Sequence, residues 1–366
     1  MLWDIFCRVI DNHGDLGVCW RLSANLAAKG HRIRLWVDDA SALTWMAPQA
    51  NLNAQSWAKL SISLGEVEVR PWNTALNKTS EPSDVWVEAF GCELPEHFVQ
   101  WAHDSSSHLP HKEPVWINLE YLSAESYVER SHRLPSPVMS GPLKGRTKWF
   151  FYPGFTEKTG GLLRESFVDE ANSVQEQSSG QSMALTPAYP SKTSLFCYEP
   201  VALTEALQLS SLNASGHVWQ VAHGRGALAF DKALHDLPAK LAQPRFEKIA
   251  PLPQSGYDEL LRSSDLNFVR GEDSLVRALW AGQALIWHIY PQDDGAHAAK
   301  LNAFLDWLEA PTSLRQFHLR WNGLSELPLP EIDLIAWQSC VQAARRRLLK
   351  QSDLVTQLLQ FVAEKG

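Results

Sequence analysis

Apolar residues along the first part of the chain alternate between short dense runs and longer stretches of helical spacing. Residues 2–10 form a nearly continuous apolar run, which is typical of a central parallel strand. Residues 18–26 then carry apolar side chains at every fourth position, and Gly30 follows as a typical helix end. Residues 31–39 alternate apolar and polar positions. The pattern therefore predicts a strand–helix–strand unit that opens at residue 2.

The same alternation of strands and helices continues through the first half of the chain. It predicts an α/β sheet with helices on both faces. Further strands are predicted at 67–72, 84–90, 115–122 and 148–155. Residues 167–193 are rich in Ser, Gln, Ala and Pro and have little periodicity, which is typical of a linker. We therefore expect one domain at 1–175, a linker at 176–193 and a second domain at 194–351.

The second half repeats the α/β pattern. Strands are predicted at 194–199, 217–224, 247–252, 265–270 and 283–290, and helices at 200–209, 257–263, 274–282, 296–309, 331–350 and 353–364. The last helix, within 352–366, is expected to pack back on the first domain. Open α/β sheets bind ligands at the carboxyl ends of their strands. Two doubly wound halves joined by a linker thus predict a ligand cleft between two sheets.

Composition narrows the function classes. The 366 residues suit two domains, and the net charge of −8 is opposite to that of a non-specific nucleic-acid binder. We therefore expect no nucleic-acid partner. An acidic chain is better suited to a partner that carries positive charge. The N-terminus has no signal-peptide pattern, and no apolar run is long enough to cross a membrane. These features predict a cytoplasmic protein without a membrane partner.

The sequence contains no recognisable metal-binding or cofactor-binding motif. The five cysteines are scattered without a C-x-x-C, which argues against a disulfide framework and a zinc site. No D-x-D triplet, phosphate-binding loop, serine-hydrolase elbow or zinc-protease motif occurs. We therefore predict neither a catalytic metal nor a cofactor.

The first strand-to-helix junction, "VIDNHGDLGVCW", combines two glycines with two aspartates. Asn12 stands where a dinucleotide fingerprint needs a glycine, so this is a poor nucleotide loop. Asp15 lies near the start of the helix, where it is either an N-cap or a catalytic carboxylate. Asp11 ends a buried strand and is either a site residue or the partner of a nearby donor.

Two further junctions in the second half could bind a ligand. In "FVRGEDSLVRALWAG", backbone N–H groups and the Ser274 hydroxyl could hold a diphosphate, and the alternative is a helix cap. Glu272 and Asp273 would oppose an anion there unless they turn toward sugar hydroxyls. In "YPQDDGAHAAKL", Gln292, Asp293 and Asp294 could bind sugar hydroxyls, and the alternative is a solvated helix start. His297 or Lys300 could bind phosphate at the same junction.

Two aromatic residues stand two apart in a predicted strand of the second half, "LFCYE". Phe196 and Tyr198 would lie on one face of that strand, near its end. They could stack on a nucleobase there, although aromatic residues at such spacing more often belong to a core.

Five ordered motifs together resemble the bacterial protein-arginine rhamnosyltransferases that mature elongation factor P (EF-P), the EarP family. This family has two Rossmann-like domains facing a cleft, the GT-B architecture. The resemblance runs from residue 2 past residue 300. It rests on "DNHGDLGVCWRLSANLA", "DVWVEAFGCELP", "WINLEYLSAESYVE", "FFYPGFTEKTGGLLRE" and "RGEDSLVRALWAGQALIWHIYPQDDGAH".

The resemblance assigns roles to the residues of these motifs. It implies that Asp15 is the general base, that Asp11 supports it, and that Glu272 is essential for handling the donor. Phe196 and Tyr198 would bind the thymine base, and Ser274 would lie at the diphosphate. The whole donor site that the resemblance implies contains Asn12, Gly14, Phe196, Tyr198, Gln254, Tyr257, Arg270, Asp273, Ser274 and Leu275.

The resemblance implies an inverting, metal-independent transfer of L-rhamnose from TDP-β-L-rhamnose to one arginine of EF-P, which would activate EF-P for the rescue of polyproline-stalled ribosomes. A carboxylate can orient the protonated guanidinium and accept a proton as the C–N bond forms. Two alternatives stay open. One is a GT-B enzyme with another nucleotide sugar or acceptor, and the other is a non-catalytic GT-B scaffold.

Overall fold

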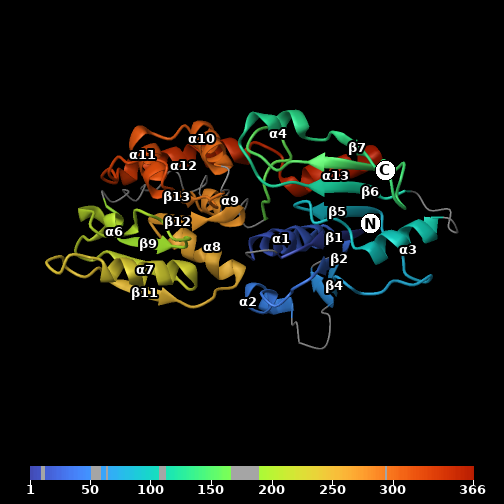
Figure 1. Ribbon diagram of the computed structural model, residues 1–366, viewed down its shortest axis with the longest axis horizontal. Coiled ribbons are helices and arrows are strands. Elements are labelled where there is room, and N and C mark those ends of the chain that lie inside the picture. Colours follow the sequence, from blue (N-terminus) through green and yellow to red (C-terminus); the bar gives the residue numbers. More distant parts are fainter. Residues whose placement is uncertain (10–12, 51–58, 63–64, 107–112, 166–188, 293–294) are drawn as a thin grey trace, which may run out of the picture. The chain divides into compact units, whose positions relative to one another are not determined.

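The computed structural model describes residues 1–9, 13–50, 59–62, 65–106, 113–165, 189–292 and 295–366. The chain forms two compact units (Figure 1). Unit 1 contains Met1–Glu165 and Gln351–Gly366, and unit 2 contains Ser166–Lys350. Most of the predicted linker lies outside the described residues, so its bounds stay a prediction.

Unit 1 is built on one eight-stranded sheet. Its six central strands are parallel, in the order β4-β2-β1-β5-β6-β8, which is the doubly wound order. Two short antiparallel strands close the edges. The strands are β1 (Leu2–Cys7), β2 (Arg32–Val37), β3 (Lys59–Ile62), β4 (Gly65–Pro71), β5 (Val85–Ala89), β6 (Val115–Leu119), β7 (Pro135–Pro137) and β8 (Thr147–Phe151).

The helices of unit 1 cover both faces of this sheet. They are α1 (Gly14–Ala28), α2 (Leu43–Met46), α3 (Glu96–Ser106), α4 (Ser126–Ser131) and the returning α13 (Leu354–Lys365), with a 3-10 turn at Pro48–Ala50. All six residues of β1 are buried, which explains its continuous apolar run. Helix α1 ends as the sequence predicts, because Gly30 has φ +86° and its N–H donates to Ala27 O.

The core of unit 1 has two sides. On one side, α1 and α13 bury aliphatic residues against the sheet, and Leu354, Leu358 and Phe361 of α13 are almost fully enclosed. The other side is an aromatic cluster. It contains Phe6, Trp36, Trp86, Phe98, Trp101 and Trp116. Helix α13 is therefore an integral part of unit 1 although it follows unit 2 in the chain.

Unit 2 has a five-stranded parallel sheet in the order β11-β10-β9-β12-β13, again the doubly wound order. Its strands are β9 (Lys192–Leu195), β10 (Val218–Ala222), β11 (Phe246–Ile249), β12 (Leu266–Arg270) and β13 (Ala284–His288). Its helices are α6 (Leu203–Ala206), α7 (Arg225–His235), α8 (Gln254–Ser263), α9 (Gly271–Ala281), α10 (Ala296–Leu308), α11 (Thr312–Trp321) and α12 (Leu334–Leu349), with a 3-10 turn at Ser210–Leu212. The α/β class predicted from the sequence is confirmed in both units.

Helix α11 and the residue after it complete the open edge of the sheet at β13. The ring Nε2 of His318 accepts a hydrogen bond from Trp287 N at 3.0 Å. Asn322 accepts from Ile289 N at 3.0 Å and donates to Trp287 O at 2.9 Å. These side chains satisfy backbone groups that an edge strand would otherwise expose.

Several predicted boundaries are wrong. The strand predicted at 194–199 ends at Leu195, and the helix predicted at 200–209 is only the single turn of α6. Helix α9 begins at Gly271 rather than at 274, directly after β12. The sequence pattern did not predict α7 or α11. In α11, Arg315, His318 and Arg320 interrupt the apolar positions.

The five cysteines are all free thiols. Among the residues described, no helix combines the length and the apolar character that crossing a membrane requires.

Candidate active site

The carboxyl ends of the two central strands mark the place where each unit can bind a ligand. The strand order reverses beside β1 in unit 1 and beside β9 in unit 2. Loops diverge at such a switch point and leave room for a ligand. The residues predicted from the junctions follow these strands and their neighbours, so each unit is considered by itself.

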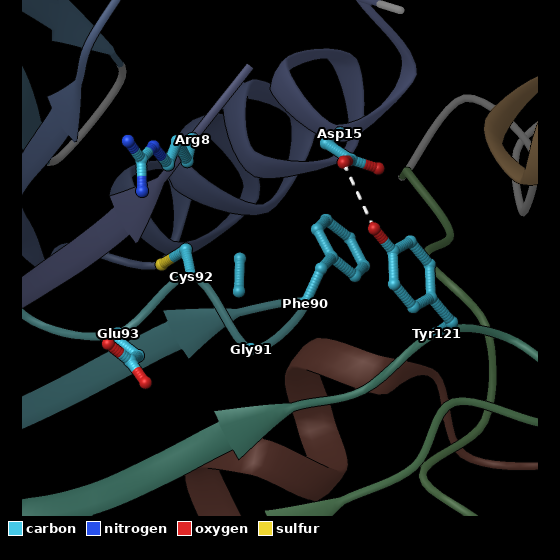
Figure 2. A pocket seen from close by; sticks show the side chains of 8 residues that line it. Arg8, Asp15, Phe90, Gly91, Cys92, Glu93 and Tyr121 are labelled. Carbon is cyan, nitrogen blue, oxygen red and sulfur yellow. Dashed lines mark hydrogen bonds between the residues drawn. The ribbon is translucent and has the colours of Figure 1, made fainter. Parts of the chain in front are cut away.

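Asp15 lies in the first turn of α1, half-buried, as the second residue of the helix. The interpretation of Asp15 as the N-cap is wrong, because His13 occupies that position and its side chain makes no capping bond. The negative charge is instead stabilised by the helix dipole. The hydroxyl of Tyr121 donates a hydrogen bond to Asp15 Oδ2 at 3.3 Å, as Figure 2 shows.

Tyr121 forms an aromatic ledge beside Asp15 together with Phe90. The two rings are stacked, with centroids 4.7 Å apart and an interplanar angle of 23° (Figure 2). Phe90 follows β5 and has φ +59°, and Gly91 has φ +67°. A left-handed backbone is strained for a bulky residue such as phenylalanine, and strain of this kind is concentrated at functional sites. The turn after β5 therefore holds the Phe90 ring against Tyr121.

These residues line a pocket at the carboxyl edge of the unit 1 sheet, with about 140 Å³ of space for water-sized molecules. Its walls carry the carboxylates of Asp15 and Glu93 and the guanidinium of Arg8. Tyr121 is 41% exposed, so the ledge is accessible. An exposed aromatic face beside a carboxylate suits a planar cation such as a guanidinium.

Of the other predicted site residues in unit 1, the structure describes only Gly14. Asp11 and Asn12 lie outside the described residues, so their roles stay predictions. Gly14 is the exposed first residue of α1. A Cβ at this position would meet no atom within 4 Å, so Gly14 lies beside open space.

In unit 2, the guanidinium of Arg270 lies between two aromatic rings. Its Cζ is 4.4 Å from the ring centroid of Phe196 and 4.8 Å from that of Tyr198. Its Nη1 donates to Cys197 O at 3.3 Å, and burial lowers the pKa of Arg270. No carboxylate of the described residues forms an ion pair with Arg270. This half-buried cation is therefore suited to an anionic ligand.

Tyr198 is 4% exposed and makes ring contacts with His288 and Tyr290 at 5.3 and 5.4 Å. The prediction that Phe196 and Tyr198 share a strand face is wrong, because both follow the end of β9. Phe196 N still donates to Phe268 O, after which the chain turns. Burial raises the pKa of Tyr198 to about 12, so the hydroxyl stays a donor.

Two predicted donor-site residues lie in the first turn of α8. Gln254 is its first residue, and the ring of Tyr257 contacts that of Phe196 edge-on at 5.7 Å. Burial raises the pKa of the Tyr257 hydroxyl. Tyr257, Phe196, Arg270 and Tyr198 thus form a continuous row, named here the aromatic–arginine cluster.

The N-terminus of α9 lies next to this cluster. Gly271, its first residue, has φ +63°, and a Cβ there would lie 3.7 Å from the Tyr198 hydroxyl. The Ser274 hydroxyl bonds with the backbone of Arg270, accepting from its N–H and donating to its carbonyl oxygen. The interpretation of Ser274 as the N-cap is wrong, because Arg270 occupies that position and Ser274 is the fourth residue of α9, where its hydroxyl bonds back to Arg270. The side chain of Leu275 is fully buried, so only its backbone could contact a ligand.

Glu272 and Asp273 lie in the first turn of α9. Glu272 forms a short ion pair with Lys300 of α10. Lys300 neutralises the charge of Glu272, so this carboxylate is compatible with an anion at the N-terminus of α9. Asp293 and Asp294, in the third junction, lie outside the described residues. Within the ranges described, no group of three or more His, Cys, Asp and Glu side chains is placed to hold a metal ion.

The sequence analysis missed Tyr121, Phe90 and Arg225 as candidates. Tyr121 and Phe90 each follow a buried strand closely, and this position could have drawn attention to them. Arg225 stands between two glycines at the β10–α7 junction, in "HGRG". Its guanidinium lies 5.3 Å from the ring centroid of Tyr198.

Comparisons with known proteins place this chain in a family. Residues 3–363 match the family model described as elongation-factor P (EF-P) rhamnosyltransferase EarP. The protein-arginine rhamnosyltransferase of Pseudomonas putida is 42% identical over 83% of this chain and 80% of its own length. That of Pseudomonas aeruginosa is 37% identical over 99% of both chains, and that of Shewanella oneidensis is 35% identical over 98% and 97%.

A solved structure described as the structural basis for EarP-mediated arginine glycosylation of translation elongation factor EF-P is also similar. It matches with a TM-score of 0.59 and 25% identity, over 100% of this chain and 99% of the other. This match and the strand orders confirm two Rossmann-like units of the GT-B type. The chain is a glycosyltransferase that belongs to the EarP family of EF-P rhamnosyltransferases.

Proposed function

We propose that this protein transfers L-rhamnose from TDP-β-L-rhamnose to an arginine side chain of EF-P in the cytoplasm, with inversion and without a metal ion. The observation that carries the proposal is the unit 1 pocket, where Asp15 lies beside the stacked rings of Tyr121 and Phe90. A protonated guanidinium can stack on such a ledge while the carboxylate accepts its N–H groups.

The chemistry requires that arginine becomes a nucleophile. Its pKa above roughly 12 keeps it protonated in water, so a base must take a proton as the C–N bond forms. Asp15 supplies the carboxylate, and the Tyr121 hydroxyl fixes its orientation. The proton passes to Asp15, the C–O bond to the diphosphate breaks, and TDP leaves. Inversion follows when the guanidinium attacks the face of the sugar opposite to TDP.

Unit 2 offers the features that a nucleoside diphosphate needs. The aromatic–arginine cluster provides flat rings for a base and one cation for phosphate oxygens. The first N–H groups of α9 have no partner inside their helix and favour an anion. Arg270 and these N–H groups together supply the positive charge that a metal ion provides in other transferases, and this supports metal independence.

The direct test is to incubate the purified protein with EF-P and TDP-rhamnose in the presence of EDTA. Fragmentation mass spectrometry is expected to place one deoxyhexose on an arginine. The Asp15→Asn variant should fold, bind TDP and give no product. Modification of no arginine would refute the proposal, and TDP binding without turnover would favour the scaffold alternative.

A further inference from the structure

Two arginines lie on the ring of Tyr198, and the family-derived site includes only one of them. Arg270 lies 4.8 Å from the ring centroid and Arg225 lies 5.3 Å from it. The Tyr198 hydroxyl in turn lies beside Gly271, where α9 begins. Arg225 is therefore separated from the N-terminus of α9 by a single tyrosine ring.

The position of Arg225 is built into the β10–α7 junction. Gly224, the N-cap of α7, has φ +88°, which favours glycine. A Cβ at Gly226 would lie 3.3 Å from both N and O of Cys197, so glycine lets the first turn of α7 approach the segment that carries Tyr198. The two glycines thus bring Arg225 against the aromatic–arginine cluster.

Glu199 holds the guanidinium in this position. Arg225 Nε donates to Glu199 Oε1 at 2.7 Å, and Nη2 donates to Oε2 at 2.6 Å. The two side chains remain about half exposed, at 49% and 55%. An exposed pair of this kind contributes little to stability because water screens both charges. The pair can therefore open at low cost if a stronger anion competes for the guanidinium.

A diphosphate is such an anion. Phosphate oxygens accept the paired N–H groups of a guanidinium as a carboxylate does, and with more negative charge. We propose that Arg225 is a second diphosphate-binding residue of unit 2, which exchanges Glu199 for the phosphate oxygens of a nucleoside diphosphate. This inference rests on the proposed function and assigns a positioning role to Glu199.

The chain contains a matched control for this ion pair. Asp231 and Lys248 form an exposed pair at 2.8 Å, with 46% and 53% exposure. Asp231 belongs to α7, the same helix as Arg225. Asp231→Asn changes the net charge as Glu199→Gln does, so it separates a general electrostatic effect from the release of Arg225.

The experiment measures TDP and thymidine binding to the full-length protein by calorimetry. Arg225→Gln is expected to weaken TDP binding about tenfold, because a charge-assisted contact is lost, and to leave thymidine binding unchanged. Arg225→Lys should recover part of the loss. Glu199→Gln should tighten TDP binding about threefold, because the guanidinium no longer has to leave a carboxylate. In the Arg225→Gln background, Glu199→Gln should have no effect.

Each other outcome overturns the inference. If Asp231→Asn and Glu199→Gln tightened TDP binding equally, the effect would come from the change in net charge and not from the release of Arg225. Equal weakening of thymidine and TDP by Arg225→Gln would mean that Arg225 only supports the rings. Unchanged TDP binding in Arg225→Gln would refute the inference and leave the proposed function intact. Absence of TDP binding by the natural protein would refute both.

Discussion

The hydroxyl of Tyr121 donates a hydrogen bond to the carboxylate of Asp15, across 3.3 Å and from a strand end 106 positions further along the chain. The sheet order makes this possible, because β6 lies two strands from β1 and both end at the same edge. The bond orients a half-buried carboxylate at the edge of the unit 1 pocket.

Tyr121→Phe should therefore slow rhamnosylation while preserving the aromatic ledge. The expected loss in kcat is about fivefold, since a hydrogen bond to a charged group contributes on the order of 1 kcal/mol when partly exposed. The KM for EF-P should change little, whereas Tyr121→Ala should raise it. Steady-state kinetics with EF-P would measure both. Tyr127→Phe is the control, because Tyr127 is also 41% exposed. A similar loss there would count against the role of Tyr121.

Arg270→Lys keeps the charge but loses the flat group that lies between Phe196 and Tyr198. We expect TDP to bind about tenfold more weakly, because the ammonium can neither stack nor donate in parallel to phosphate. Titration calorimetry would measure the change. Arg262→Lys, at a surface ion pair with Glu259, should bind TDP as the natural protein does. Unchanged affinity in Arg270→Lys would place the diphosphate elsewhere.

Lys300→Met removes the cation that pairs with Glu272. The carboxylate then opposes an anion at the N-terminus of α9, so TDP affinity should fall about tenfold. Adding Glu272→Gln to this variant should restore most of the lost affinity, since the opposing charge disappears. A double-mutant cycle with TDP measures the coupling. Additive effects would mean that Lys300 binds the ligand independently of Glu272.

Buried neutral histidines should make the fold sensitive to acid. Burial lowers the pKa of His318 to about 4 and that of His288 to about 3, below the usual 6.5. As the pH falls, the histidines of the unfolded chain bind protons before those of the folded chain do. Their contribution to the free energy of unfolding is therefore fully present above pH 6.5 and is lost as the pH falls toward their pKa values in the folded protein. Between pH 7 and pH 5 each histidine should cost about 2 kcal/mol of unfolding free energy.

Urea denaturation at several pH values would test this dependence. His318→Gln keeps a donor and an acceptor but does not titrate, so its unfolding free energy should vary less with pH. His235→Gln, on the exposed end of α7, is the control and should follow the natural protein. Identical pH profiles for both variants would show that His318 does not contribute.

The regular parts of the fold could be predicted from the sequence because their signals are local. A strand buried on both faces needs a continuous apolar run, and residues 2–10 show one. Gly30 and Gly282 end their helices in the left-handed conformation that glycine favours. Asp15 and Glu272 could be proposed as site residues because both lie at strand-to-helix junctions, and the resemblance to the EarP family implied their roles.

The remaining parts depend on contacts that a linear pattern does not contain. Helix α11 carries His318 at a fully buried position, so its apolar stripe is interrupted. The pocket in unit 1 needs Tyr121, which approaches Asp15 only through the order of strands. Arg225 is brought to Tyr198 in the same way, by the neighbouring positions of β10 and β9. A local sequence pattern describes one junction at a time and does not show which two junctions lie next to each other in the sheet.

The position of α13 sets the order in which the two units can be completed during synthesis. A ribosome makes the strands of unit 1 first and all of unit 2 next, and only then the helix that carries Leu358 and Phe361. Until that helix emerges, one side of the first sheet lacks part of its apolar cover. Unit 2 can reach its final form earlier, so the unit that is made first is finished last.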